Sequence, residues 1–218
     1  MRVQLFPSAL RHTPRLRLAL LLAAPAVLLS GAAIVCPDTA CGAGAVDAAG
    51  LALAARGHAP LVDAFFRFIT WGGSLLVLGP LAIAHAIFAW QRLRSWQAFF
   101  VPCALAGAVL MGHAAKMLVA RERPALDALI EMPADASFPS AHTLQVSTFV
   151  LAWLLAPGLG AGRPRALAIG LAILLVVLVA WSRLHLQVHY PSDILFALAA
   201  GTIWVVALRQ LAIWSPQA

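Results

Sequence analysis

The sequence predicts an all-α integral membrane protein, a bundle of six transmembrane helices. Hydrophobic residues make up 62% of the 218 residues and charged residues only 11%, whereas a soluble domain usually carries about 25% charge. The mean hydropathy is +0.90. The apolar residues are concentrated in stretches that approach the length of about 20 helical residues needed to cross a bilayer. Disorder and an ordinary soluble fold are therefore disfavoured.

Each apolar stretch is interpreted as a helix, because only a helix satisfies its own backbone hydrogen bonds in lipid. Arg15 and Arg17 precede the first apolar run, so a cleaved signal peptide is the alternative there. The run is longer than a typical signal core, which favours an uncleaved span. We expect spans at 16–35, 69–90, 98–119, 143–159, 166–184 and 192–212, all within a single domain, 1–218.

Residues 44–66 form the longest connection between spans. Charged and polar side chains, including Asp47, Arg56 and Asp63, interrupt its apolar residues. We therefore expect a short amphipathic helix that lies at the membrane interface.

Charged residues are unevenly distributed in this six-span arrangement. Nine cations and no acid fall on the side of both termini, and the other side holds all eight acids with the remaining six cations. Because Lys and Arg favour the cytoplasmic side, both termini are predicted to be cytoplasmic. The short loops favour a bacterial cytoplasmic membrane. The nine cations are Arg2, Arg11, Arg15, Arg17, Arg92, Arg94, Arg163, Arg165 and Arg209; the other six are Arg56, Arg67, Lys116, Arg121, Arg123 and Arg183; the acids are Asp38, Asp47, Asp63, Glu122, Asp127, Glu131, Asp135 and Asp193.

The net charge of +7 then reflects membrane orientation. No nucleic-acid-binding module is recognisable, so nucleic acid is not an expected partner. Cys36 and Cys41 either form a bridge, if their loop faces an oxidising compartment, or remain free thiols. The sequence leaves this choice and the oligomeric state open.

Polar side chains form three clusters at the outer ends of the spans. Lys116 and Arg123 are seven residues apart, so they share a helix face and could hold an anion such as phosphate; the alternative is two cations snorkelling at a span end. Ser140 and His142 precede the fourth span, where free backbone N–H groups favour an anion; the alternative is an ordinary capping turn.

The third cluster combines two histidines, an acid and a cation. Asp193 is expected in the first turn of the sixth span, close to His189. A carboxylate that accepts a hydrogen bond from one imidazole nitrogen leaves the other nitrogen as a nucleophile or base. Arg183 adds a fixed cation near the same edge.

Together these clusters resemble the signature of the type 2 phosphatidic acid phosphatase (PAP2) superfamily, which also includes vanadium haloperoxidases. The family pattern is K-x6-R-P, then P-S-G-H, then S-R-x5-H-x3-D. Ala141 replaces the glycine and keeps its backbone N–H. The replacement would be unfavourable only if the backbone at this position required a positive φ. The matching residues are Lys116, Arg123, Pro124, Pro139, Ser140, His142, Ser182, Arg183, His189 and Asp193.

The resemblance implies a PAP2-like fold and a membrane-bound phosphatase acting on a lipid phosphate or pyrophosphate. It implies that His189 attacks phosphorus, that Asp193 orients His189 and that His142 is the general acid and base. It implies no cofactor and no metal. The phosphate would be held by Lys116, Arg123, Ser140, Ala141 and Arg183.

Other functions share some of these features. His185, His189 and Asp193 are spaced four apart, as on helical metal-binding faces, but Pro191 interrupts the helix between them. A lipid phosphotransferase would use the same site. A haloperoxidase shares the anion pocket, but those relatives are soluble. A transporter or channel would place charges through the membrane, whereas these charges gather at one edge.

Overall fold

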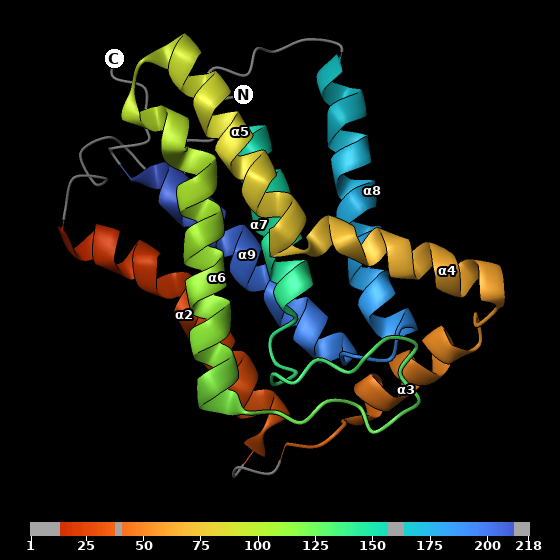
Figure 1. Cartoon of the computed structure of the whole chain (residues 1–218). Coiled ribbons are helices and arrows are strands. Elements are labelled where there is room, and N and C mark those ends of the chain that lie inside the picture. Colours follow the sequence, from red (N-terminus) through yellow and green to blue (C-terminus); the bar gives the residue numbers. More distant parts are fainter. Residues whose placement is uncertain (1–13, 38–40, 157–163, 212–218) are drawn as a thin grey trace.

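The structure is a computed structural model that describes residues 14–37, 41–156 and 164–211, and its regular elements are all helices (Figure 1). The predicted all-α class is confirmed. Within these residues five helices are long and apolar enough to cross a membrane. They are α2 (Pro14–Val35), α5 (Leu75–Leu93), α6 (Phe100–Val119) with the preceding 3-10 turn η3 (Trp96–Phe99), α8 (Pro164–His185) and α9 (Pro191–Gln210).

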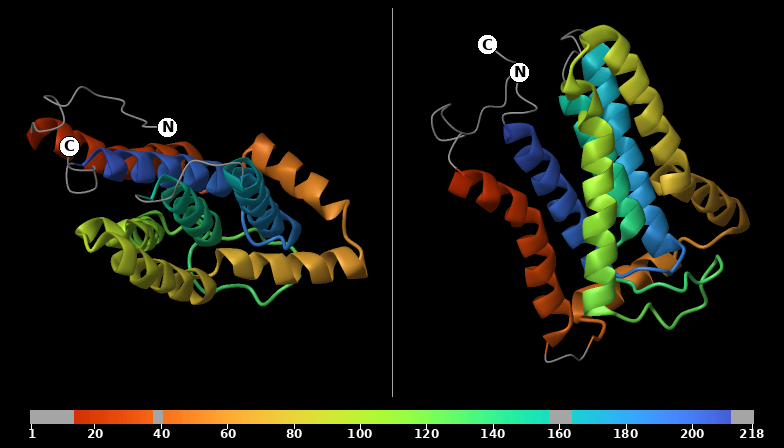
Figure 2. Two further views of the ribbon diagram at one scale, coloured as in Figure 1. Left: turned by 90° about the horizontal axis from the view of Figure 1, so that it is seen from above. Right: turned by 60° about the vertical axis from the view of Figure 1, so that its left-hand side comes forward.

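The predicted fourth span is a shorter apolar helix, α7 (Ala141–Leu155), of 15 residues. It ends early because Ala156 precedes a proline, and a residue in that position is disfavoured in the α conformation. α7 packs against α6, α8 and α9, and the view from above shows it inside the bundle (Figure 2). Its first turn is therefore enclosed by the neighbouring helices.

The connection before α5 differs from the prediction, because it contains two helices, α3 (Ala45–Ala55) and α4 (Pro60–Ile69). Gly57 lies between the end of α3 and the start of α4. Pro60 begins α4, at a first-turn position that suits proline. α4 runs across the bundle (Figure 1). The turn η2 (Thr70–Gly73) then joins α4 to α5.

The second span also begins later than the predicted residue 69. Ser74 caps α5, because its Oγ accepts a hydrogen bond from Leu76 N over 3.2 Å. The preceding turn, η2, packs against α7.

Small residues set the distances between the inner helices. A Cβ added to Gly201 on α9 would lie 2.6 Å from the Ser147 Oγ of α7, and one added to Gly107 on α6 would lie 2.3 Å from the ring of Trp204. Such close approach is typical of membrane helix packing. It lets α9 lie close to both α7 and α6.

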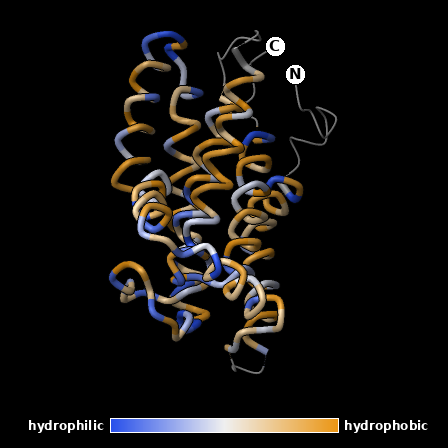
Figure 3. Tube along the Cα trace, turned by 90° about the vertical axis from the view of Figure 1, so that its right-hand side faces the viewer, coloured by the Kyte–Doolittle hydropathy of each residue, from blue (hydrophilic) through white to orange (hydrophobic). Residues whose placement is uncertain are grey.

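Apolar residues run along the helices, and hydrophilic residues gather in the connections (Figure 3). Large apolar side chains such as Leu22, Ile173 and Leu195 are exposed on the outer faces, as expected of helices surrounded by lipid. Several residues of the topology prediction lie outside the described residues: Arg2, Arg11, Asp38, Arg163, 157–159 and 212.

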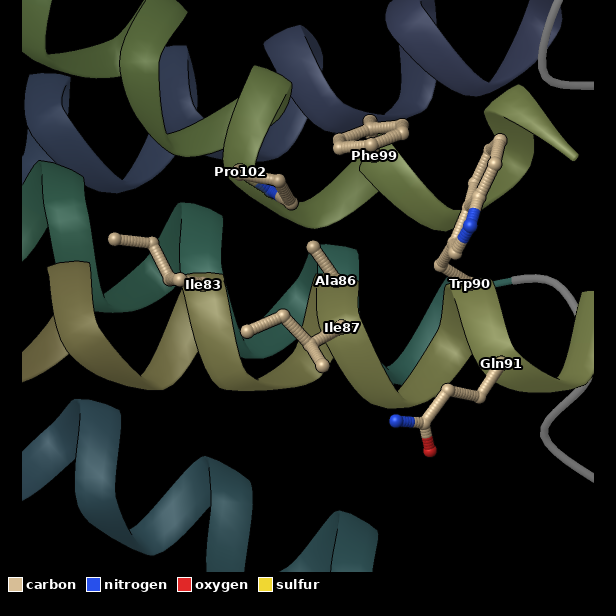
Figure 4. A pocket seen from close by; sticks show the side chains of 7 residues that line it. All are labelled: Ile83, Ala86, Ile87, Trp90, Gln91, Phe99 and Pro102. Atoms are coloured by element: carbon tan, nitrogen blue, oxygen red, sulfur yellow. The ribbon is translucent and has the colours of Figure 1, made fainter. Parts of the chain in front are cut away.

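An apolar groove of about 390 Å³ separates α5 from η3 and the start of α6 (Figure 4). Ile87, Trp90 and Phe99 are among its lining residues. The groove lies near the Arg92–Ser95 turn, at the opposite end of α6 from Lys116. It is therefore remote from the polar clusters.

Candidate active site

The three polar clusters come together at one end of the bundle. They occupy the end of α6, the start of α7, the end of α8 and the start of α9, where the 120–139 loop also runs (Figure 1). The predicted site residues found at these positions are Lys116, Arg123, Ser140, Ala141, His142, Arg183, His189 and Asp193.

His189 lies between a carboxylate and a guanidinium. Its Nδ1 is 3.3 Å from Asp193 Oδ2, and its Nε2 is 3.2 Å from Arg123 Nη1. A guanidinium can only donate hydrogen bonds. Nε2 must therefore be the unprotonated acceptor. Nδ1 carries the proton and donates a hydrogen bond to Asp193.

The chain turns sharply between α8 and α9 to place His189. Gln187 adopts a left-handed conformation with φ 59°, and Val188 N donates to Arg183 O over 3.2 Å, which closes the end of α8. The Gln187 side chain donates to Leu51 O of α3. Asp193 Oδ2 accepts from Tyr190 N over 2.9 Å and so caps α9.

Burial sets the protonation of His189. The side chain is almost fully buried, and the loss of hydration lowers its pKa to about 3, although the hydrogen bond to Asp193 opposes this. His189 is therefore neutral at physiological pH. A neutral imidazole with an unprotonated Nε2 is the form required of a nucleophile.

Two of the predicted phosphate-binding cations share a carboxylate. Asp135 lies 3.2 Å from Lys116 Nζ and 2.6 Å from Arg123 Nη2. Partial burial alone would raise the pKa of Asp135, but Lys116 and Arg123 lower it below its usual value. Lys116 also donates to the Ala136 carbonyl. The side chain of Asp135 is 55% exposed, so this carboxylate sits at the mouth of the site.

Arg183 is a buried cation with spare hydrogen-bonding capacity. Its Nη1 donates to Thr70 Oγ1 of η2 over 2.6 Å, but its Nε is buried without an acceptor among the described residues. A buried guanidinium that lacks an anionic partner is costly. Arg183 is thus suited to an anion that enters the site.

The start of α7 contributes the remaining predicted residues. Ser140 stands at the N-cap position, but its Oγ pairs with Thr143 Oγ1 over 3.0 Å instead of capping the backbone. The described non-glycine residues with positive φ are Arg94, Ala120 and Gln187. Ala141 is not among them, so its backbone does not require the glycine of the family pattern.

His142 is held in place by close packing. A Cβ added to Gly73 of η2 would lie 2.9 Å from the Cβ and backbone oxygen of His142. The absence of a side chain at Gly73 therefore lets η2 approach the first turn of α7. Within electrostatic range of the His142 imidazole are Lys116, Arg123, Arg183 and His189.

A family model described as the PAP2 superfamily matches residues 97–215, more than half of the chain. The chain belongs to the PAP2 superfamily.

Two curated PAP2 relatives are similar in sequence. The putative undecaprenyl-diphosphatase YbjG of Escherichia coli K12 is 34% identical over 139 residues, covering 59% of this chain and 64% of the relative. The decaprenylphosphoryl-5-phosphoribose phosphatase of Mycobacterium tuberculosis is 36% identical over 124 residues, covering 56% of this chain and 63% of the relative. The matches thus span less than two thirds of each relative.

The fold is similar to that of a solved PAP2 structure, the transmembrane PAP2-type phosphatidylglycerolphosphate phosphatase from Bacillus subtilis. The TM-score is 0.73 at 22% sequence identity, over 88% of this chain and 94% of that one. The likeness shows that the bundle has the PAP2 membrane fold, as the sequence predicts. The five described helices that are long and apolar enough to cross a membrane support a multi-pass membrane protein.

The PAP2 pattern did not indicate several residues that contact the site. Arg121, Asp47, Ser137 and Asp135 were either assigned to the charge map or not singled out. Ser137 Oγ donates to Asp193 Oδ2 over 2.5 Å. The one sequence signal for Arg121 was its position, two residues before the motif residue Arg123. No sequence spacing links Asp47 to Arg121.

The alternative metal set divides between two places. His185 Nε2 is 2.7 Å from Asp63 Oδ1 of α4, whereas His189 contacts Asp193. His58, Asp63 and His185 offer ligand atoms within 4.8 Å of one another and could hold a metal ion. His58 Nε2 is already paired with the His185 carbonyl at 3.0 Å, so hydrogen bonds alone account for this group, which ties α4 to the end of α8.

The open question about the cysteines is resolved, because Cys36 and Cys41 form a disulfide. It joins the end of α2 to the segment that leads into α3. Disulfides persist in oxidising compartments. The bridge lies at the same end of the bundle as the candidate site, because the neighbouring Gly42 carbonyl accepts from Arg121 over 2.9 Å.

Asp135→Asn is expected to strengthen anion binding, because the Asp135 carboxylate is paired with the two cations that a phosphate would contact and so competes with it. Removing the negative charge of Asp135, which repels the vanadate anion, should lower the inhibition constant of orthovanadate about fivefold, the equivalent of about 1 kcal/mol. The measurement is inhibition of phosphate release at several salt concentrations. Weaker inhibition in this variant would show instead that Asp135 orients Lys116 and Arg123.

Proposed function

We propose that this protein is a metal-independent lipid phosphatase that acts through a phosphohistidine intermediate. It hydrolyses a phosphomonoester or pyrophosphate of a lipid at the outer side of the membrane. The observation that carries the proposal is the placement of His189, whose Nε2 faces Arg123 while its Nδ1 faces the Asp193 carboxylate. The PAP2 family membership supports the same reaction class.

In the first step, His189 Nε2 forms a bond to phosphorus as the bond from phosphorus to the leaving oxygen breaks. His142 donates a proton to that oxygen. Asp193 compensates the positive charge that develops on His189. Phosphoryl transfer depends mainly on position and charge stabilisation, and the phosphate oxygens would be held by Lys116, Arg123, Arg183, Ser140 and the Ala141 N–H.

In the second step, His142 removes a proton from water, and the water oxygen attacks phosphorus. The bond between phosphorus and Nε2 breaks, which releases inorganic phosphate and restores neutral His189. His142 serves as acid and then as base, so it regains its starting protonation state in each cycle.

A polyprenyl lipid that carries a phosphate or pyrophosphate group is the substrate class that the relatives support, since the two named above carry undecaprenyl and decaprenyl in their names. Phosphatidate and phosphatidylglycerol phosphate are the other candidates. A site at the end of the bundle lets a headgroup reach the histidines while the lipid tail remains in the membrane.

The proposed orientation places both termini in the cytoplasm of a bacterium and the site outside its cytoplasmic membrane. The segregation of cations supports it, and the Cys36–Cys41 disulfide near the site is typical of an oxidising compartment. A cysteine-labelling reagent that cannot cross membranes should modify an engineered cysteine in the 120–139 loop only from outside.

The experiment is phosphate release by purified protein, in EDTA, from polyprenyl diphosphate, polyprenyl phosphate, phosphatidate and phosphatidylglycerol phosphate. We expect release from at least one of these lipids. A second labelled lipid in the same micelles tests for transfer. Strict dependence on Mg²⁺ or Zn²⁺ would contradict a metal-independent site, and phosphate found on the second lipid would identify a phosphotransferase.

A further inference from the structure

Arg121 is a buried cation two residues from Arg123, with a different set of contacts. Its side chain is fully buried. Nη1 donates to Asp193 Oδ1 over 2.6 Å and to Ser192 Oγ over 2.8 Å. Nη2 donates to Asp47 Oδ2 over 2.7 Å and to Gly42 O over 2.9 Å.

These four contacts use all four N–H groups of the terminal nitrogens. The Tyr190 ring covers one face of the guanidinium, with Cζ 4.0 Å from the ring centroid. Arg121 therefore has no terminal N–H left for a phosphate, although its Nε, like that of Arg183, is buried without a hydrogen-bond partner among the described residues.

The contacts of Asp193 divide between its two oxygens. Oδ1 accepts from Arg121, and Oδ2 accepts from Ser137 and Tyr190 and faces His189 Nδ1. A guanidinium locked on Oδ1 fixes the rotation of the carboxylate and so directs Oδ2 at the imidazole. It also supplies the opposite charge that a buried carboxylate needs.

Asp47 holds Arg121 from the opposite side. Its side chain is 6% exposed, and it accepts hydrogen bonds from Ser192 N and Ser192 Oγ over 2.9 and 2.8 Å. Asp47 lies in α3, outside the matched region 97–215. A segment beyond the family match thus completes the surroundings of Asp193.

We propose that Arg121, held by Asp47, is a positioning residue that orients the Asp193 carboxylate toward His189 and keeps it ionised. The inference rests on the proposed function, because it assigns Arg121 a part in the same phosphoryl transfer. Arg121 acts through Asp193 and does not contact the substrate phosphate. Its loss should therefore slow turnover without weakening phosphate binding.

The experiment compares wild type with Arg121→Ala, Arg121→Lys and Asp47→Asn. The readouts are kcat, the inhibition constant of orthovanadate and the thermal unfolding temperature in detergent. Because the aspartate that orients a catalytic histidine can contribute about 10⁴-fold to kcat, loss of Arg121 should lower kcat about 100-fold. The vanadate constant should change less than about threefold, which is within about 0.7 kcal/mol.

The conservative variants separate positioning from folding. Lysine keeps the charge but cannot contact both carboxylates in a fixed fork, so Arg121→Lys should recover part of kcat. Asp47→Asn should lower kcat less than Arg121→Ala, again with vanadate inhibition unchanged. In the double variant Arg121→Ala/Asp47→Asn, the second substitution should lower kcat little further than Arg121→Ala alone, since Asp47 acts through Arg121. Arg56→Ala, which removes an exposed cation after α3, is the matched control.

Three results would overturn the inference. The first is an Arg121→Ala enzyme with kcat within threefold of wild type. The second is a parallel loss of kcat and vanadate binding, which would make Arg121 a phosphate ligand. The third is an Arg121→Lys or Asp47→Asn variant that is stably folded and has full kcat. Inactive wild type on every lipid would instead reject the proposed function, and this inference with it.

Discussion

His189→Ala is expected to abolish phosphate release while the protein remains folded in detergent. In the proposed mechanism the imidazole supplies the atom that bonds to phosphorus, and no other described histidine shares its contacts with Asp193 and Arg123. Removing a nucleophile that acts as part of a unit costs at least about 10⁴-fold in kcat. The measurement is phosphate release from the best lipid substrate, with unfolding temperature as the test of folding.

His113→Ala is the matched control for this loss. His113 lies on α6 one turn before Lys116, but its side chain is exposed whereas Lys116 is buried. Its removal should leave kcat within twofold. Turnover that persists in folded His189→Ala would remove His189 as the nucleophile. It would then favour direct attack by water, with His142 as the base.

His142→Ala is expected to trap the phosphorylated enzyme. With p-nitrophenyl phosphate the leaving group needs no proton, so His189 is still phosphorylated. Hydrolysis of the intermediate then lacks its base, a loss of about 10²- to 10⁴-fold. We expect a burst of one p-nitrophenolate per enzyme, followed by slow turnover. With a lipid substrate, whose leaving group needs a proton, both steps should be slow.

The trapped species can be identified chemically, since a phosphohistidine is labile in acid and stable in base. The double variant His142→Ala/His189→Ala should give neither a burst nor a labelled protein. Steady turnover of His142→Ala at the wild-type rate, without a burst, would show that His142 is not the base. A label stable in acid would place the phosphoryl group on an oxygen.

Local chemistry explains why most of the architecture was predictable. Each membrane helix needs about 20 apolar residues, a property that the sequence displays without knowledge of contacts. The residues of the third motif are close because they are near in sequence, as His189 and Asp193 are four residues apart. The prediction that Lys116 and Arg123 share a helix face was wrong, because α6 ends at Val119 and Arg123 lies in the following loop. Both cations instead meet at Asp135.

The connection before α5 was predicted less well. Its polar residues indicated an interfacial helix but did not show that Gly57 and Pro60 would divide it into α3 and α4. Boundaries there depend on capping by single residues such as Ser74. They also depend on close packing, as between Gly73 and the first turn of α7. Hydropathy is insensitive to both.

By itself, the sequence determined the membrane class, the approximate spans and the motif residues of the candidate site, because hydropathy and short-range spacing are local properties. The tertiary structure alone decided which charges meet. Arg121 joins Asp47 and Asp193, which are 74 and 72 residues away, and Asp135 bridges Lys116 and Arg123. A buried charge requires a partner wherever the fold can supply one, and the separation of the two residues in sequence gives no indication of which partner that is.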